Sequence, residues 1–147
     1  MPKDSDLRTI QNIHFMTDYI INSNTKIRFA RENEVGTILS FIKELAEYEK
    51  LPNEVTATEE LLHKTIFEEH HAQVLFCEVD DTIIGFALFF FNFSTFVGKP
   101  GLYLEDLYIK PEMRKRGLGK AFFQVLAQIA SENNCGRMEW ICLDWNQ

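Results

Sequence analysis

The chain has 147 residues, the length of one domain with enough apolar residues to build a core. Its formal net charge of −7 disfavours a nucleic-acid partner, because such binders usually present a net basic face. The longest apolar run, Ile83 to Phe91, has strand length and falls short of the roughly eighteen residues that a membrane-spanning helix needs, so we expect no membrane insertion.

The first 25 residues are polar and mixed, apart from a short apolar patch at Ile20 and Ile21. They lack the apolar segment of a secretory signal peptide. We interpret residues 1–25 as an N-terminal extension, or as sequence upstream of a start at Met16, and assign no chemistry to them. The sequence is compatible with a helix there. The folded domain is then expected over residues 26–147.

The middle of the chain predicts one strand, two helices and two further strands. A short strand is expected at residues 26–30, followed by a helix at 34–50, where apolar residues recur every three or four positions. The spacing Thr56-x-x-Glu59 is typical of a capping box and predicts the start of the second helix. Two strands joined by a hairpin turn follow at residues 74–79 and 83–93.

The cysteines and histidines give no sign of a metal site. Cys77, Cys135 and Cys142 are odd in number and lack the spacing of metal ligands. Cys77 and Cys142 fall within apolar strands, which favours buried free thiols and a reducing compartment, taken here as the cytoplasm. The histidines between residues 63 and 71 have no second ligand set at a suitable spacing, so no metal is expected.

The C-terminal part of the chain predicts a buried strand, a loop, a helix and a last strand. The strand runs from Leu102 to Ile109 and ends before Pro111, which cannot donate to a strand ladder. An apolar face with helical spacing extends from Leu118 to Ala130. The last strand is expected at residues 137–143.

The loop between this strand and helix reads Arg114-x-x-Gly117-x-Gly119. A glycine-rich helix start binds anions, because its unpaired N–H groups and the helix dipole favour a phosphate. Five of the eleven residues from Lys110 to Lys120 are basic, which favours a phosphate site in this acidic chain. The spacing matches neither a P-loop nor a dinucleotide-binding fingerprint. The alternative is a solvated charge run or a localisation signal.

This motif, placed after a Leu-Glu-Asp strand and before an amphipathic helix, resembles the acetyl-coenzyme A loop of the GNAT superfamily of N-acetyltransferases. The order of predicted elements over residues 26–147 resembles that superfamily as well. The resemblance implies an α/β GNAT fold, with a mixed, mostly antiparallel sheet flanked by helices.

Several short segments narrow the resemblance to the diamine (spermidine/spermine) acetyltransferase family. They are Leu45–Glu49, the Gly98-Lys99 loop, Tyr103–Asp106 and Leu143–Gln147. The loop at Ser94-Thr95-Phe96 and the Leu-Asp-Trp-Asn-Gln end are most similar to the thialysine N-epsilon-acetyltransferase branch.

The resemblance implies acetyl-CoA as the cofactor. Its pantetheine arm would pair with the backbone of Leu107 and Ile109 like an added strand, and the N–H groups from Lys115 to Lys120 would hold the pyrophosphate. The implied cofactor-binding residues are Leu107, Tyr108, Ile109, Arg114, Lys115, Arg116, Gly117, Leu118, Gly119, Lys120 and Asn146.

Acetylation of an amine needs a proton acceptor, because an aliphatic amine has a pKa of about 10 and about one molecule in a thousand is neutral at pH 7. The resemblance places Glu105 as the catalytic base, acting through water. The implied substrate-binding residues are Tyr48, Glu49, Ser94, Glu105, Glu139, Trp140 and Ile141. A structural ion pair is the alternative for Glu105, as core packing is for Trp140, and the role of Asp106 is left open.

Two departures from the family pattern bear on function. Polyamine-specific members carry an acidic residue in place of Ser94 and a tryptophan in place of Phe96, so a small amine or an amino-acid side chain is expected rather than spermidine. The general-acid tyrosine lies beyond the position of Gln147 in the family, with a C-terminal helix and the last two strands. We therefore expect a C-terminally incomplete domain.

The leading hypothesis is an N-acetyltransferase that acts on a small-molecule amine by direct attack, without an acyl-enzyme, because no cysteine or serine lies in an activating motif. One alternative is a non-catalytic acyl-CoA-binding or regulatory module, or a short product that turns over poorly. Another is a basic patch that binds nucleic acid, which the net charge disfavours. Family members are commonly dimers, so a homodimer is expected.

Overall fold

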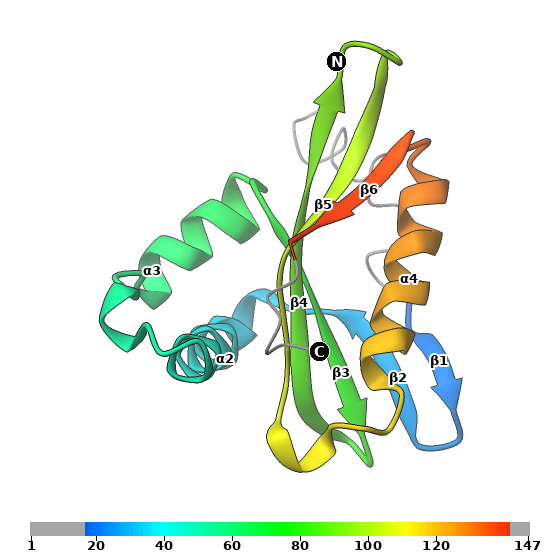
Figure 1. The fold of residues 1–147 in the computed structure, drawn as a ribbon. Coiled ribbons are helices and arrows are strands. Elements are labelled where there is room, and N and C mark those ends of the chain that lie inside the picture. Colours follow the sequence, from blue (N-terminus) through cyan, green and yellow to red (C-terminus); the bar gives the residue numbers. More distant parts are fainter. Residues whose placement is uncertain (1–16, 142–147) are drawn as a thin grey trace.

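The computed structural model describes residues 17–141. One six-stranded sheet, in the order β1-β2-β3-β4-β5-β6, forms the centre of the fold. The pairs from β1 to β5 are antiparallel, and β6 is parallel to β5. Helices α2 and α3 lie on one side of the sheet and α4 lies on the other (Figure 1). The predicted mixed, mostly antiparallel sheet flanked by helices is confirmed.

The strands are β1 (Tyr19–Asn22), β2 (Thr25–Phe29), β3 (Gln73–Val79), β4 (Thr82–Ser94), β5 (Lys99–Ile109) and β6 (Arg137–Trp140). The helices are α2 (Val35–Tyr48), α3 (Glu59–Leu62), which a π-helical segment continues over His63–Glu68, and α4 (Leu118–Glu132). In the described part of the chain, no helix is both long enough and apolar enough to span a bilayer.

The core has two parts, one on each face of the sheet. On the face covered by α4, Phe122 and Leu126 are fully buried and pack in one cluster with Phe89 of β4. On the face covered by α2, Phe41 stacks on Phe86 with ring centroids 5.6 Å apart. Each helix therefore buries the apolar stripe that its sequence spacing predicts.

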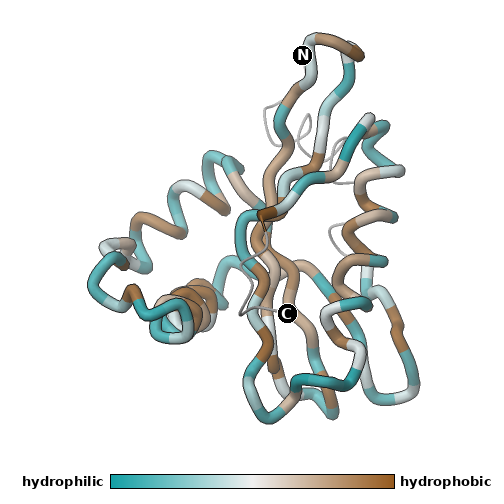
Figure 2. Tube along the Cα trace, viewed as in Figure 1, coloured by the Kyte–Doolittle hydropathy of each residue, from teal (hydrophilic) through white to brown (hydrophobic). Residues whose placement is uncertain are grey.

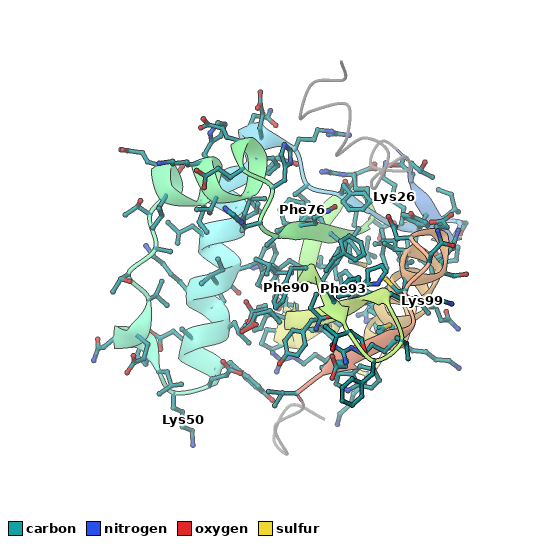
Figure 3. All side chains as sticks on the ribbon, turned by 90° about the horizontal axis from the view of Figure 1, so that it is seen from above. Lys26, Lys50, Phe76, Phe90, Phe93 and Lys99 are labelled. Carbon is teal, nitrogen blue, oxygen red and sulfur yellow. The ribbon has the colours of Figure 1, made fainter. Side chains whose placement is uncertain are left out.

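The pictures show the same division between inside and outside. Apolar residues lie along the central strands, and most of the connecting turns consist of polar residues (Figure 2). Phe76 lies inside the molecule, whereas Lys50 and Lys99 lie at its periphery (Figure 3).

A buried arginine ties the start of α2 to the sheet. Arg28 on β2 is 5% exposed and forms an ion pair with Glu78 on the neighbouring strand β3. Its other guanidinium nitrogens donate to both carboxylate oxygens of Glu34, at 2.9 and 2.7 Å. The Arg28 guanidinium holds the pKa of Glu34 below its usual range. This network fixes the turn that leads from the sheet into α2.

The structure adds a strand that the sequence analysis did not predict. β1 lies within the stretch interpreted as an N-terminal extension, and it is the edge strand of the same sheet, with Tyr19 opposite Ile27. Tyr19 is buried and Ile20 is 70% exposed, so the strand alternates in the usual way over very few residues. A four-residue strand gives too short a pattern to be recognised without its partner.

Two boundaries differ from the predictions. The N-cap of α3 is Thr58, whose hydroxyl accepts from the Leu61 N–H at 3.1 Å, and the predicted capping box at Thr56 is wrong. β5 begins at Lys99, not at Leu102, because β4 and β5 pair up to Ser94 and Lys99. The hairpin loop is therefore only four residues long.

Candidate active site

The sheet opens between β5 and β6. The two strands pair only from Gly101 opposite Arg137 to Leu104 opposite Trp140. Over the described residues β6 ends there, while β5 continues from Glu105 to Ile109 without a strand on that side. Figure 1 shows β6 ending beside the middle of β5. We call this unpaired stretch of β5 the open edge.

A β-bulge marks the beginning of the open edge. Leu104 lies opposite Phe89 and Asp106 lies opposite Leu88, so Glu105 is an extra residue without a partner on β4. A bulge re-aims the residues around it. Leu104 before the bulge and Leu107 after it both pack on the face covered by α4, which strict alternation would not allow. Glu105 therefore lies at the fork between the strands, where its side chain is exposed.

Among residues 17–141, no strand pairs with the outer side of the open edge, so its outward-facing backbone groups lack a strand partner there. The Lys110 N–H, directly after β5, donates to the Ile84 carbonyl on β4 at 2.9 Å. Because successive residues of a strand direct their N–H groups to opposite sides, the N–H groups of Ile109 and Leu107 face away from β4. These are the two residues predicted to pair with the pantetheine arm. Glu105 and Ile109 are about 13 Å apart along the strand.

A cleft of about 480 Å³ adjoins the open edge. The end of α2 forms one wall with Leu45 and Tyr48, and Leu107–Ile109 of β5 form another. The loop after β5 and the start of α4 close it, with Met113, Arg114, Lys115, Gly117, Leu118 and Gly119. The structure thus brings together most of the residues predicted to bind a cofactor.

The start of α4 is open to a ligand. Gly117 is the N-cap, with a left-handed φ of 78°, and within the described residues no side chain caps this helix end. The first helical bond runs from the Ala121 N–H to the Gly117 carbonyl at 3.0 Å, so the N–H groups of residues 118–120 have no partner within the helix. Three basic residues in or directly beside this helix start are exposed: Lys115, Arg116 and Lys120.

Arg114 lies apart from this exposed basic group. Its Nε donates to the Ile109 carbonyl at 2.9 Å. Its guanidinium carbon lies 4.4 Å from the ring centroid of Tyr48 and 5.3 Å from that of Tyr108. Motif spacing identified Arg114 as a basic residue of the loop but gave no sign of these contacts.

Three carboxylates gather at the other end of the open edge. Burial, together with the charges of Glu105 and Glu49, raises the pKa of Asp106 to about 6. Glu105 acts on Asp106 as its neighbour on β5, and Glu49 acts on it because the C-terminal end of α2 lies beside this strand. We call Glu49, Glu105 and Asp106 the acidic corner. Sequence reasoning left Asp106 without a role.

Three further residues predicted to bind the substrate lie on β6 or directly after it. Glu139 forms an ion pair with Arg137, with Nε and Oε1 3.1 Å apart, and accepts from Asn92 Nδ2 at 3.3 Å, so its carboxylate already has partners. Trp140 packs edge-on against Phe123 with ring centroids 4.9 Å apart, yet it remains 48% exposed. Ile141 is 75% exposed.

Ser94, a predicted substrate-binding residue, lies far from the cleft. Ser94 lies opposite Lys99 at the far end of the β4–β5 hairpin. Lys99 and Glu105 are six positions apart along the strand, a distance of about 20 Å. Asn146 lies outside the residues that the structure describes.

Comparison with known proteins identifies the family. The Acetyltransferase (GNAT) family matches residues 38–147. Thialysine N-epsilon-acetyltransferase of Bos taurus is 38% identical over 130 residues, covering 82% of this chain and 76% of that protein. The Caenorhabditis elegans protein of the same name is 39% identical over 125 residues, covering 84% and 76%.

Spermidine/spermine N(1)-acetyltransferase-like protein 1 of Homo sapiens is 33% identical over 131 residues, or 83% of this chain and 19% of that protein. The chain therefore belongs to the GNAT acetyltransferase family, and thialysine and spermidine/spermine acetyltransferases are among its relatives. The predicted family and enzyme class are confirmed.

Solved structures agree on the fold. An aminoglycoside acetyltransferase from an uncultured soil metagenomic sample superposes with a TM-score of 0.73 at 18% identity, covering 86% of this chain and 83% of that chain. A Clostridium acetobutylicum acetyltransferase with acetyl-CoA gives a TM-score of 0.68 at 16% identity, covering 84% of each chain. At these identities the likeness shows the GNAT fold alone.

Proposed function

We propose that this chain transfers an acetyl group from acetyl-CoA to a primary amine of a small molecule. One observation supports this most: the open edge of β5 joins the uncapped start of α4 to the carboxylate of Glu105. An extended chain with a diphosphate at one end fits such a site, because the site offers strand-like N–H groups and an anion-binding helix start.

Each part of the site has a role in this proposal. The N–H groups of residues 118–120, with the exposed Lys115, Arg116 and Lys120, hold the pyrophosphate. The N–H groups of Leu107 and Ile109 align the pantetheine arm along the open edge. Acetyl-CoA, when bound, supplies the thioester carbonyl that the amine attacks.

The acidic corner prepares the amine. Its carboxylates attract the ammonium form of the substrate, which predominates at neutral pH. Glu105, exposed at the fork, accepts the proton through a water molecule, so that the neutral amine becomes the nucleophile. Positioning of the two reactants beside each other supplies much of the rate.

The substrate class follows from the charge of the site and from the relatives. The acidic corner favours a cation, and the thialysine acetyltransferases named above act on an amine of an amino-acid side chain. We therefore propose a lysine-like amino acid or a short diamine. A polyamine is less favoured, because Ser94 is uncharged where polyamine-specific members carry an acid.

The proposed site is completed by a second copy of the chain. Three apolar side chains at the tip of the β4–β5 hairpin are exposed: Phe93 at 60%, Phe96 at 100% and Val97 at 59%. The hairpin projects beyond the helices (Figure 1). A homodimer formed through this tip would cover the exposed residues. It would also bring Ser94 of one chain to the site of the neighbouring chain. Light scattering should then give twice the mass of one chain, and Phe96→Ser should give monomers.

The alternative is a chain that binds acyl-CoA without efficient turnover. The surroundings of Tyr108, which lies on the open edge, favour this alternative. The Tyr108 hydroxyl lies 3.2 Å from Glu44 Oε1, and burial with the charge of Glu44 raises its pKa. This tyrosine is therefore a poor acid for the departing thiolate.

The test is acetyl-CoA-dependent acetylation of thialysine, lysine and short diamines, followed by thiol release and by the mass of the product. We expect turnover in the wild-type chain. Glu105→Gln should lower turnover by about 100-fold or more with little change in coenzyme A affinity. Coenzyme A binding without turnover of any of these amines would support the alternative. Absence of coenzyme A binding would contradict both.

A further inference from the structure

The loop that joins β5 to α4 needs an anchor. Most of its residues are exposed. After Lys110, whose N–H donates to the Ile84 carbonyl, the described backbone bonds of the loop are short-range, such as Met113 N–H to the Lys110 carbonyl at 2.9 Å. Lys115 and Gly117 both have left-handed φ angles, of 64° and 78°. A non-glycine residue holds such a conformation only where the surrounding structure enforces it. Met113 anchors the loop on one side, against the core covered by α4.

Arg114 anchors the loop on the other side, because its side chain contacts both walls of the cleft. Its Nε donates to the Ile109 carbonyl at 2.9 Å, which ties the loop to β5. Its guanidinium lies over the ring of Tyr48 at the end of α2, at 4.4 Å, and near the ring of Tyr108. Hydrogen-bonding and ring contacts together use both the edge and the face of the guanidinium group.

These contacts argue against Arg114 as a ligand of the phosphates. Its side chain is half-buried among protein groups, whereas Lys115 and Arg116 are exposed in the same loop. The Ile109 carbonyl, on the open edge, already accepts from Arg114, so the Ile109 N–H is the group left for the pantetheine arm.

We propose that Arg114 is a positioning residue, which holds the loop against β5 and the end of α2 so that the N–H groups at the start of α4 face the cleft. This rests on the proposed binding of coenzyme A. It also links the two halves of the site, because Tyr48 belongs to the predicted substrate-binding set and Glu49 of the acidic corner follows it directly.

Replacing Arg114 by lysine distinguishes a positioning role of the side chain from a role of its positive charge alone. Lysine keeps the positive charge but has no Nε donor in a planar fork and no guanidinium face. Arg114→Lys and Arg114→Ala should therefore both weaken coenzyme A binding by about 10-fold or more, the effect of one lost charge-assisted hydrogen bond. Arg116→Ala removes an equal charge from the same loop and serves as the comparison.

Calorimetric titration with coenzyme A at low and at moderate salt gives the second readout. A lost phosphate contact reduces the salt dependence of binding, because fewer charges are neutralised. We expect Arg116→Ala to reduce it, and both Arg114 variants to keep that of the wild-type chain. Tyr48→Leu should weaken binding, and Arg114→Ala combined with Tyr48→Leu should cost less than the sum of the two.

Several results would overturn the proposal. Wild-type affinity in Arg114→Lys, or a salt dependence reduced as much as in Arg116→Ala, would make Arg114 a charge that meets the phosphates. Strictly additive effects of Arg114→Ala and Tyr48→Leu would contradict the proposed link between Arg114 and α2. Thermal unfolding shows which variants are folded. If Arg114→Ala does not fold, Arg114→Lys replaces it in the comparison with Tyr48→Leu. If the wild-type chain does not bind coenzyme A, the proposed function fails and this role fails with it.

Discussion

Replacing Asp106 by asparagine tests the acidic corner through protein stability. Burial and the charges of Glu105 and Glu49 raise the pKa of Asp106 from 3.8 to about 6. A carboxyl group whose pKa is raised in the folded state stabilises the fold while it is protonated. That contribution is lost as the pH rises through the folded pKa. Asparagine has nearly the same shape and carries no charge, so it should relieve the cost of ionisation.

The magnitude follows from the two pKa values. With 3.8 in the unfolded chain and about 6 in the folded chain, ionised Asp106 costs about 3 kcal/mol at pH 7.5 and about 0.5 kcal/mol at pH 4. Asp106→Asn should therefore raise the free energy of unfolding by up to about 3 kcal/mol at pH 7.5, with little gain at pH 4. For a chain of this length the gain corresponds to a rise in melting temperature of about 6–12 °C.

Urea unfolding at both pH values measures the effect. Asp81→Asn is the control, because Asp81 is exposed in the β3–β4 turn, and it should change the free energy of unfolding by less than about 0.5 kcal/mol. The same Asp106 variant should raise the KM for the amine at pH 7.5, since one attracting charge is gone. An equal gain in stability at pH 4 and pH 7.5, or no gain at pH 7.5, would refute the reasoning.

Two further substitutions test the framework of the site. Arg28→Met should lower the free energy of unfolding by about 3–5 kcal/mol, because it leaves the buried carboxylate of Glu78 and the half-buried carboxylate of Glu34 without their partner. Urea unfolding measures this against Arg31→Met, at an exposed arginine, and equal effects would contradict the account. Gly117→Ala should cost about 1 kcal/mol at its left-handed φ, whereas Gly36→Ala in α2 should stabilise the chain. Thermal unfolding compares the two, and a gain at Gly117 would be inconsistent with the described loop.

Patterns within single elements predicted most of the fold. The helical spacing of apolar residues gave α2 and α4, and the apolar runs gave β3, β4 and most of β5. The uncapped start of α4 was predictable too, because it depends on Gly117 and Gly119, which carry no side chain that could cap the helix. Each of these features is encoded by neighbours in the chain.

The parts that the sequence did not reveal depend on contacts between distant segments. The bulge at Glu105 arises from the register of β5 against β4, which no pattern within β5 determines. The contact between Arg114 and Tyr48 joins residues far apart in the sequence. The distance of Ser94 from the cleft follows from the continuous pairing of β4 and β5 between the bulge and Ser94, a stretch in which the sequence predicted no strand before Leu102.

The most direct test is to map coenzyme A onto the backbone by NMR titration of the ¹⁵N-labelled chain. We predict that the amide signals of Leu107, Ile109 and residues 117–120 move most and that their hydrogen exchange slows on binding. Largest changes elsewhere in the sheet, or changes that do not saturate, would contradict the claim that the open edge and the start of α4 hold the cofactor.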